Sequence, residues 1–391
     1  RSFRYLPQWF SQPLTAGAGV NSNYYRPLLQ LSFAVDYKLW GLWPAGYHLE
    51  NMLWHTAAAI LLYLFLKELL RNFEFRISNF EFSTPVAFAT ALMWLVHPAH
   101  VEAVAYANSR GDSMATVFIL LSLILWMPPY GWSPVRVKKR FWGSAITFIL
   151  ALLSKEFAII TPGLMALISF VNLTNGKFTK LPTAKLPVWT KSLFIMFSIA
   201  AVYTVLRLTV LNFQNTLNFY GADTAKIDQT QPLALYATSL PVRLMTFLKV
   251  LPIYAGILVW PNDLHMERTV GIATTAADKT VIIVAAVVIV ILLYCYIAVR
   301  RKKFLVPFAV GWFMISIFPV SGLIPISQIL AEHFLYLPSI GFFLIVSWAL
   351  VSIIRQRIPL FLVFCFLFLA LAFKTIRQNR VWRDPITFYE Y

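Results

Sequence analysis

The sequence predicts an all-α protein that crosses a membrane many times. Of its 391 residues, 59% are hydrophobic and 13% are charged, and the mean hydropathy is +0.69. Its apolar runs match the roughly 20 residues that a helix needs to cross a hydrocarbon core about 30 Å thick. The polar residues also alternate between the ends of these runs, because lysine and arginine cluster on one side while the six histidines and most in-span carboxylates collect on the other. Both observations indicate a multi-spanning membrane protein.

The basic loops set the expected orientation. They lie at 67–76, 136–140, 177–191, 300–303 and 355–357. Short basic loops mark the cytoplasmic face, so the opposite helix ends are expected to open on the non-cytoplasmic side. The net charge of +17 is then explained by topology and by contact with anionic membrane lipids, and no nucleic-acid partner is expected. Cys295 and Cys365 both lie within apolar runs, which excludes a disulfide framework and a cysteine zinc site.

Three regions follow one another along the chain. Residues 1–45 are expected to form an outer loop with an amphipathic interfacial helix at 27–41. A transmembrane domain follows over 46–376, and residues 377–391 form an outer segment. Hydropathy predicts about ten spans in the domain. These are 46–68, 84–106, 112–128, 141–154, 157–173, 192–212, 281–299, 304–320, 334–353 and 359–375.

Segment 238–260 is the exception to this pattern. The loops 177–191 and 300–303 are both basic, so the chain between them must cross an even number of times, yet it offers three apolar segments. The segment carries two prolines and two cations within its apolar run: Pro241, Arg243, Lys249 and Pro252. We expect it to be re-entrant or interfacial, because irregular backbone is tolerated at membrane depth only where protein or water covers it.

The stretch HPAHVEAVAYANSRGD at 97–112 is the richest in polar chemistry. Pro98 lacks a backbone donor, so the helix is expected to break there and restart with Pro98 at its first position. The polar side chains that this break would gather are His97, His100, Glu102, Arg110 and Asp112. Three interpretations remain open: a polar floor for a phosphate or a sugar, a divalent-metal site built from His, His and Glu, and a helix-end network that satisfies freed backbone groups.

Further candidates lie at the outer ends of other spans. Lys155 and Glu156 occupy the tip between two short spans, where Lys155 can hold a phosphate as a point charge or simply reach the membrane interface. Arg26, Asp36, His48 and His333 are the remaining polar candidates, each with an interfacial anchor as the alternative. His55 lies deeper in its span and is expected to be a hydrogen-bonded core histidine. Inserting a charged side chain into a membrane span is energetically unfavourable, so several such residues near one another suggest a functional site.

Five stretches, taken together, resemble one family. They are YRPLLQLSFAVDYKLWGLWPAGYHLENMLWH (25–55), HPAHVEAVAYANSRGD (97–112), ALLSKE (151–156), EHFLYLPSIGF (332–342) and IRQNRVWRD (376–384). In this order they resemble the multi-spanning GT-C glycosyltransferases, most closely the TMTC-like O-mannosyltransferase group with its bacterial relatives. The resemblance implies transfer, with inversion, of mannose or another hexose from a polyprenyl- or dolichyl-phosphate donor to a Ser or Thr hydroxyl of a protein on the non-cytoplasmic side.

The resemblance also implies roles for individual residues. The candidates for holding the donor phosphate and the substrate are Arg26, His48, His97, His100, Arg110, Lys155, Glu156 and His333. The candidate catalytic carboxylates are Glu102 and Asp112, with Asp36 as a fallback base. Position 333 is His where the family has Arg, so phosphate binding there requires a protonated ring.

The family's general base lies in an acidic loop upstream of YRP, and residues 1–24 contain no Asp or Glu. The main base is therefore expected upstream of Arg1, in a longer protein whose tetratricopeptide repeats follow the membrane part. The only small-molecule partner expected is the lipid-linked sugar, and a divalent metal is left open. The expected location is a bacterial inner membrane, or the endoplasmic reticulum in a eukaryote.

Three other functions compete with this one. Transfer to a lipid or polysaccharide acceptor fits the same residues, because acceptor choice depends on outer loops and additional domains. A transporter or flippase for a polyprenyl-linked sugar predicts broken helices paired between two halves, but segment 238–260 has no such partner in the first half. A scaffold that has lost activity is a further alternative. The chain has no Walker motif and no GxGxxG, so neither ATP-driven transport nor nucleotide-sugar chemistry is supported.

Overall fold

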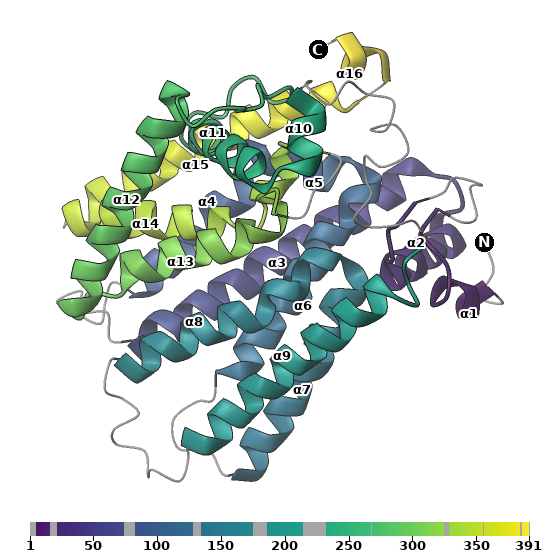
Figure 1. Ribbon diagram of the computed structural model, residues 1–391, viewed down its shortest axis with the longest axis horizontal. Helices are drawn as coiled ribbons and strands as arrows, with labels where there is room; N and C mark the ends of the chain where they lie inside the picture. Colours follow the sequence, from purple (N-terminus) through teal and green to yellow (C-terminus); the bar gives the residue numbers. More distant parts are fainter. Residues whose placement is uncertain are drawn as a thin grey trace.

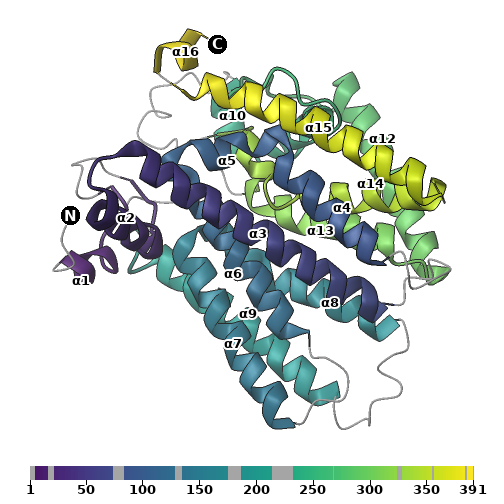
Figure 2. The same cartoon turned by 180° about the vertical axis from the view of Figure 1, so that it is seen from behind.

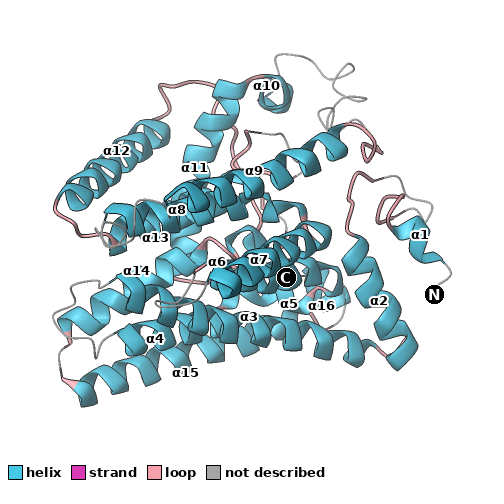
Figure 3. Ribbon diagram, turned by 90° about the horizontal axis from the view of Figure 1, so that it is seen from below, coloured by secondary structure: helices cyan, strands magenta, loops and turns pink. Residues whose placement is uncertain are grey.

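The computed structural model describes residues 5–15, 22–73, 83–127, 134–174, 186–213, 232–266, 268–323, 328–354, 356–383 and 385–390, and these residues form helices joined by loops (Figure 3). The α-helices are α1 Leu6–Trp9, α2 Pro27–Trp40, α3 Pro44–Phe73, α4 Ser83–Val96, α5 Val101–Ala105, α6 Arg110–Trp126, α7 Pro134–Ser154, α8 Thr161–Thr174, α9 Leu186–Leu208, α10 Pro232–Thr238, α11 Leu240–Val259, α12 Lys279–Arg300, α13 Leu305–Ile317, α14 Ser339–Ile353, α15 Arg357–Val381 and α16 Pro385–Glu390. Short 3₁₀ turns are η4 Pro98–His100, η5 Ala107–Ser109, η6 Glu156–Ile160, η9 Phe318–Val320 and η10 Glu332–Leu335. The predicted all-α fold is confirmed for these residues.

Seven helical segments of the described chain are long and apolar enough to cross a membrane. They are Pro44–Arg71, Ala107–Trp126, Glu156–Leu173, Thr190–Leu208, Leu240–Val259, Lys279–Arg300 and Arg357–Val381. Three shorter apolar helices accompany them: Ser83–Val96, Leu305–Val320 and Ser339–Ile353. The predicted span at 141–154 lies inside the 21-residue α7, whose basic first turns lengthen it beyond the sequence expectation. The chain is therefore a multi-spanning membrane protein.

The helices form a bundle with two distinct ends (Figures 1 and 2). α3 packs against α4 and α6, α6 packs along α7, and α14 packs against α4 and α13. Consecutive long helices run in alternate directions, so the starts of α3, α6 and α14 lie at the same end as the ends of α4 and α7. We call this the polar end. The basic residues 300–303 lie in the turn between α12 and α13 at the opposite end.

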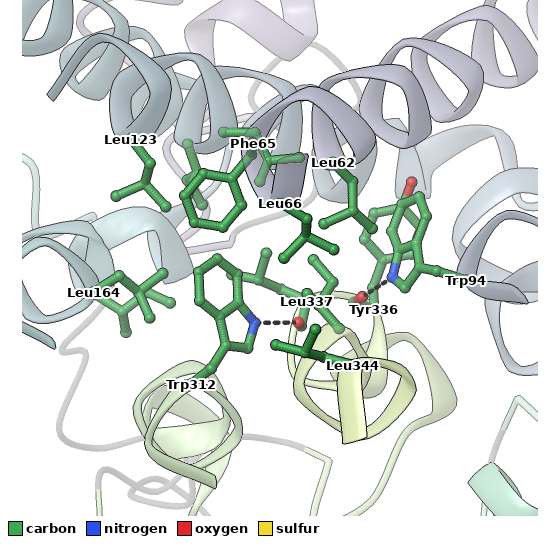
Figure 4. Packing of buried hydrophobic residues seen from close by; sticks show 14 of the residues in the cluster. Leu62, Phe65, Leu66, Trp94, Leu123, Leu164, Trp312, Tyr336, Leu337 and Leu344 are labelled. Atoms are coloured by element: carbon green, nitrogen blue, oxygen red, sulfur yellow. Dashed lines mark hydrogen bonds between the residues drawn. The ribbon is translucent and has the colours of Figure 1, made fainter. Parts of the chain in front are cut away.

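Buried side chains from most of these helices meet in one apolar core (Figure 4). Leucine and phenylalanine side chains of α3, α6, α8 and α14 line it, among them Leu62, Phe65, Leu66, Leu123, Leu164 and Leu344. Two tryptophans of this core hydrogen-bond to the backbone. Trp94 Nε1 donates to the carbonyl of Tyr336 at 2.8 Å, and Trp312 Nε1 donates to the carbonyl of Leu337 at 3.0 Å. These bonds satisfy backbone acceptors just before α14, where an unpaired carbonyl would be costly. α14 begins at Ser339 rather than near 334, because the turn η10 and Pro338 precede it.

Segment 238–260 is a regular helix and not irregular backbone. α11 is long and apolar enough to cross a membrane, yet both of its ends contact the polar end of the bundle. Near its start, Arg243 lies against Gly322, just beyond α13, and at its far end Lys374 of α15 lies 4.2 Å above the Trp260 ring. Midway, Lys249 Nζ pairs at 2.9 Å with Asp278, the N-cap of α12. These contacts place α11 across the polar end, beside α10 (Figure 1), and they fit the interfacial alternative.

Candidate active site at the polar end

The predicted helix break at Pro98 is present. α4 ends at Val96, and η4 begins with Pro98 behind the N-cap residue His97, whose Nδ1 accepts from the Ala99 N–H at 3.3 Å. α5 and η5 then carry the chain along the polar end before it re-enters the bundle as α6 at Arg110. The break therefore places the residues of 97–112 at one end of the molecule, as expected.

Lys155 forms the most direct ion pair of this end. Its Nζ lies 2.7 and 2.6 Å from the two carboxylate oxygens of Asp112. An extended backbone (φ −159°, ψ 141°) turns Lys155 out of α7, while Asp112 lies in the first turn of α6, where the helix dipole favours an anion. Gly111 permits this approach, since a Cβ there would lie 3.2 Å from the carbonyl oxygen of Ser154. Burial lowers the pKa of Lys155, and the Asp112 carboxylate opposes that shift.

Arg26 and Glu156 form a second pair beside the first. Arg26 Nε and Nη2 lie 3.0 and 2.9 Å from Glu156 Oε2, and the backbone N–H of Tyr25 donates to Oε1 at 3.3 Å. The charge of Asp112 acts on Arg26, and that of Arg26 acts on Lys155, so the two pairs are neighbours. We call Arg26, Asp112, Lys155 and Glu156 the Lys155 cluster. Its two cations retain 11% and 13% side-chain exposure, which leaves them within reach of a ligand.

Arg110 lies under α2 and has no exposed surface. Its Nη2 is 2.5 Å from Asp36 of α2, its Nε donates to Asn51 at 2.7 Å, and its guanidinium lies 4.8 Å above the Phe33 ring. These contacts tie helix α2 to α3 and α6. This geometry favours an anchoring role for Arg110 and Asp36 over contact with a phosphate or an acceptor.

The buried histidines belong to an aromatic cluster with Trp94, Tyr336 and Phe343. His55 has Nδ1 2.7 Å from the Tyr336 hydroxyl and Nε2 2.9 Å from the carbonyl of Leu95, so it is the hydrogen-bonded core histidine that the sequence predicts. His100 has its ring nitrogens at 2.7 Å from the Trp94 carbonyl and 3.1 Å from the Ser339 hydroxyl. Burial lowers the pKa of His97 to about 3 and that of His100 well below its ordinary value. Both rings are therefore neutral, and the geometry favours a structural role for them. His48, by contrast, is exposed on the first turns of α3.

Glu102 and His333 form a separate polar group. His333 Nδ1 lies 2.6 Å from Glu102 Oε1, and its backbone N–H donates to Oε2 at 2.9 Å. Glu332, the residue before His333, accepts from the backbone N–H of His265 at 2.7 Å and pairs with Arg268 at 3.3 Å. The sequence did not single out Arg268 or His265, because their loop has no recognisable pattern around them. We call Glu102, His265, Arg268, Glu332 and His333 the Glu102 cluster.

A metal centre has no support in the residues that the structure covers, since no three His, Cys, Asp or Glu side chains there are arranged to hold an ion. His97, His100 and Glu102 therefore do not form the metal site left open by the sequence. His100 and Glu102 are each bonded elsewhere.

Comparison with known proteins identifies relatives of one kind. The chain is 24% identical over 93% of its length to the protein O-mannosyl-transferase TMTC3 of Homo sapiens, where the match covers 40% of that protein. It is 26% identical over 93% of its length to the protein O-mannosyl-transferase F38B6.6 of Caenorhabditis elegans, covering 48% of it. It is also 30% identical over 62% of its length to the protein O-mannosyl-transferase Tmtc1 of Drosophila melanogaster, covering 27%.

The chain thus spans less than half the length of these curated relatives. No family model matches it, and no solved structure matches it. The matches to the human and nematode proteins nevertheless extend over nine-tenths of an all-helical membrane chain. The chain is therefore similar, along most of its sequence, to proteins named protein O-mannosyl-transferases.

Proposed function

We propose that this chain is the GT-C-type membrane part of a glycosyltransferase acting on proteins. It takes mannose or another hexose from a polyprenyl- or dolichyl-phosphate donor and passes it, with inversion, to a Ser or Thr hydroxyl on the non-cytoplasmic side. The names of its relatives support the reaction class. The observation that carries the proposal is the Lys155 cluster, which offers two partly exposed cations at the end of the bundle opposite the basic residues 300–303.

In this reaction the bond between the sugar C1 and the donor phosphate oxygen breaks, and the phosphate leaves with the electron pair. The acceptor oxygen forms the new bond to C1 from the opposite face, and its proton passes to a base. Lys155 and Arg26 stabilise the negative charge that the departing phosphate gains, which is where preorganised cations contribute most. Asp112 and Glu156 hold these cations in position and become available to other partners when the phosphate takes over.

The remaining candidates have supporting roles in this proposal. His48 is exposed on α3 and can contact the sugar or the acceptor. Glu102 and His333 form a bonded pair that can orient a hydroxyl. Arg110 and Asp36 secure α2, which follows directly after Arg26. The main general base is proposed to lie in the acidic loop upstream of Arg1, as the family resemblance implies.

A transfer assay tests the proposal. Full-length protein in lipid nanodiscs receives labelled polyprenyl-phosphate hexose and a Ser/Thr-rich peptide, beside Lys155→Ala and the control Lys38→Ala, which removes an exposed cation of α2. We expect label on the peptide with wild type and with the control, and at least a tenfold loss with Lys155→Ala. Donor binding without peptide labelling would indicate a lipid or polysaccharide acceptor. A folded protein that does not bind the donor would contradict the proposal.

A further inference from the structure

Arg207 is a buried cation at the polar end that neither the motifs nor the relatives single out. It lies in the last turn of α9 and is 9% exposed. Its guanidinium donates to two backbone carbonyls, Nη1 to Leu211 and Nη2 to Asn23. Asn23 is three residues before Arg26, so Arg207 borders the chain segment that delivers Arg26 to the Lys155 cluster.

The charge of Arg207 is not matched by an acid among the described residues, where no carboxylate lies within ion-pair distance of it. Its field nevertheless acts on Glu156, Tyr203 and Tyr25. Arg207 therefore adds a third cation to the Lys155 cluster, which holds two cations and two carboxylates. Three positive and two negative charges leave a net charge of +1.

A buried positive charge without a counter-charge is unfavourable, so an excess of this kind suggests an anionic ligand. We infer that Arg207 is a third cation of the donor phosphate site and that a phosphodiester carrying one negative charge completes the balance. A lipid-phosphate sugar is such a phosphodiester. A guanidinium has five N–H donors in a fixed fork, and the two carbonyls occupy only part of that set, which leaves donors for a phosphate oxygen. This inference rests on the proposed function and adds to it the charge of the ligand that the site selects.

A purely structural role is the competing explanation. Besides its bond to Arg207, Asn23 accepts from the backbone N–H of Phe213 at 3.3 Å, and the rings of Tyr25 and Phe213 are 6.4 Å apart. Arg207 could therefore serve only to fasten residues 22–26 to the end of α9. The two roles differ in what they require, because fastening needs the fork that bridges two carbonyls, whereas a phosphate can also be held by the point charge of a lysine.

Two substitutions separate these requirements. Arg207→Lys keeps the charge but loses the fork, and Arg207→Gln loses both. We measure the donor KM and kcat with labelled polyprenyl-phosphate hexose, and the melting temperature of each variant in the same nanodiscs, with Lys38→Gln as the control. The expected result is a donor KM raised at least tenfold by Arg207→Gln, raised no more than about threefold by Arg207→Lys, and unchanged in the control.

Equal donor KM values for the two Arg207 variants, with equally lowered melting temperatures, would overturn the inference and leave only the fastening role.

Direct binding of labelled polyprenyl phosphate provides a second measurement that does not require turnover. If wild type binds this lipid but transfers no sugar, the proposed acceptor chemistry is contradicted, while the lipid affinities of the two Arg207 variants still test the role of Arg207. If the folded wild type does not bind the lipid, both the proposed function and the role of Arg207 in phosphate binding are contradicted. If Arg207→Gln does not fold, a binding constant for Arg207→Lys weaker than wild type by more than tenfold would contradict the inference, and one within threefold would support it.

Discussion

Glu332 shows how a single buried carboxyl makes the polar end sensitive to pH. It is 3% exposed and belongs to the Glu102 cluster. Burial raises the pKa of Glu332 to about 8, and the nearby Glu102 charge acts in the same direction while Arg268 opposes it. In the folded protein the carboxyl therefore binds its proton more tightly than in the unfolded chain, where the ordinary value is 4.5. The resulting stabilisation is fully present below pH 4.5 and is lost as the pH rises through about 8.

This sign leads to a prediction for Glu332→Gln. The amide stays neutral at every pH, so the melting temperature of the variant is expected to change less between pH 5 and pH 9 than that of wild type, which should fall over this range. The measurement is a thermal melt in one detergent at several pH values. His265, Arg268, Glu102 and His333 surround the group and remain in both proteins, so the two proteins differ only at position 332. Parallel curves for the two proteins would contradict the assigned protonation of Glu332.

At the scale of elements, the contact between α13 and α14 depends on one glycine. A Cβ on Gly341 would lie 2.3 Å from the carbonyl oxygen of Ala309, which is a backbone atom that no rotamer change can move. Gly341→Ala is therefore expected to force the two helices apart and to destabilise the protein by about 2 kcal/mol or more, the usual cost of overpacking. Thermal unfolding should show a lower melting temperature for this variant.

Gly256→Ala provides the matched control. Gly256 also lies within a helix, but a Cβ there would have no atom within 4 Å apart from its chain neighbours and the backbone of its own helix. Alanine at such a position is expected to leave stability unchanged or to raise it by about 0.4–1 kcal/mol, because it restricts the unfolded chain. Equal losses for the two variants would show that helix–helix distance at Gly341 is not what limits stability.

Whole-molecule architecture was largely predictable, because it depends on patterns that are local in the sequence. Apolar runs predicted the order of the long helices, and Pro98 predicted the break that places the buried Glu102 at the polar end. The loop at 177–185 that supported the orientation lies outside the described residues, so that part of the argument stays a prediction. Helix ends were less predictable, since η10 and Pro338 delay the start of α14 and the basic first turns of α7 remain helical.

Pairing within the site could not be predicted, since it joins residues far apart in the chain. Neighbouring Lys155 and Glu156 take different partners, Asp112 and Arg26, from α6 and from the segment before α2. Arg207 carried one available signal, because it lies within the apolar segment Thr190–Leu208, and a charge within a span points to a partner or a ligand. The hydrogen-bond partner of Arg207, the backbone carbonyl of Asn23, could not be predicted, because only the fold brings α9 and residues 22–26 together.

The orientation of the bundle is a property of the whole molecule and can be tested with three cysteines. In a background without Cys295 and Cys365, we place single cysteines at Thr238 before α11, at Asp263 after it and at Lys303 between α12 and α13, all exposed positions. If α11 lies across the polar end and that end is non-cytoplasmic, a membrane-impermeant maleimide will label Thr238→Cys and Asp263→Cys in intact cells. Lys303→Cys should react only after the membrane is opened.

The pattern of labelling separates the two parts of this prediction. Opposite accessibility at positions 238 and 263 would mean that α11 crosses the membrane, as its length and composition allow, and the contacts of Arg243 and Lys374 would then have to be reassigned. Labelling of both 238 and 263 only after permeabilisation would still be consistent with an interfacial α11, but it would show that the protein has the opposite orientation in the membrane. The Lys155 cluster would then face the cytoplasm, and the lipid-linked donor would have to be supplied from that side.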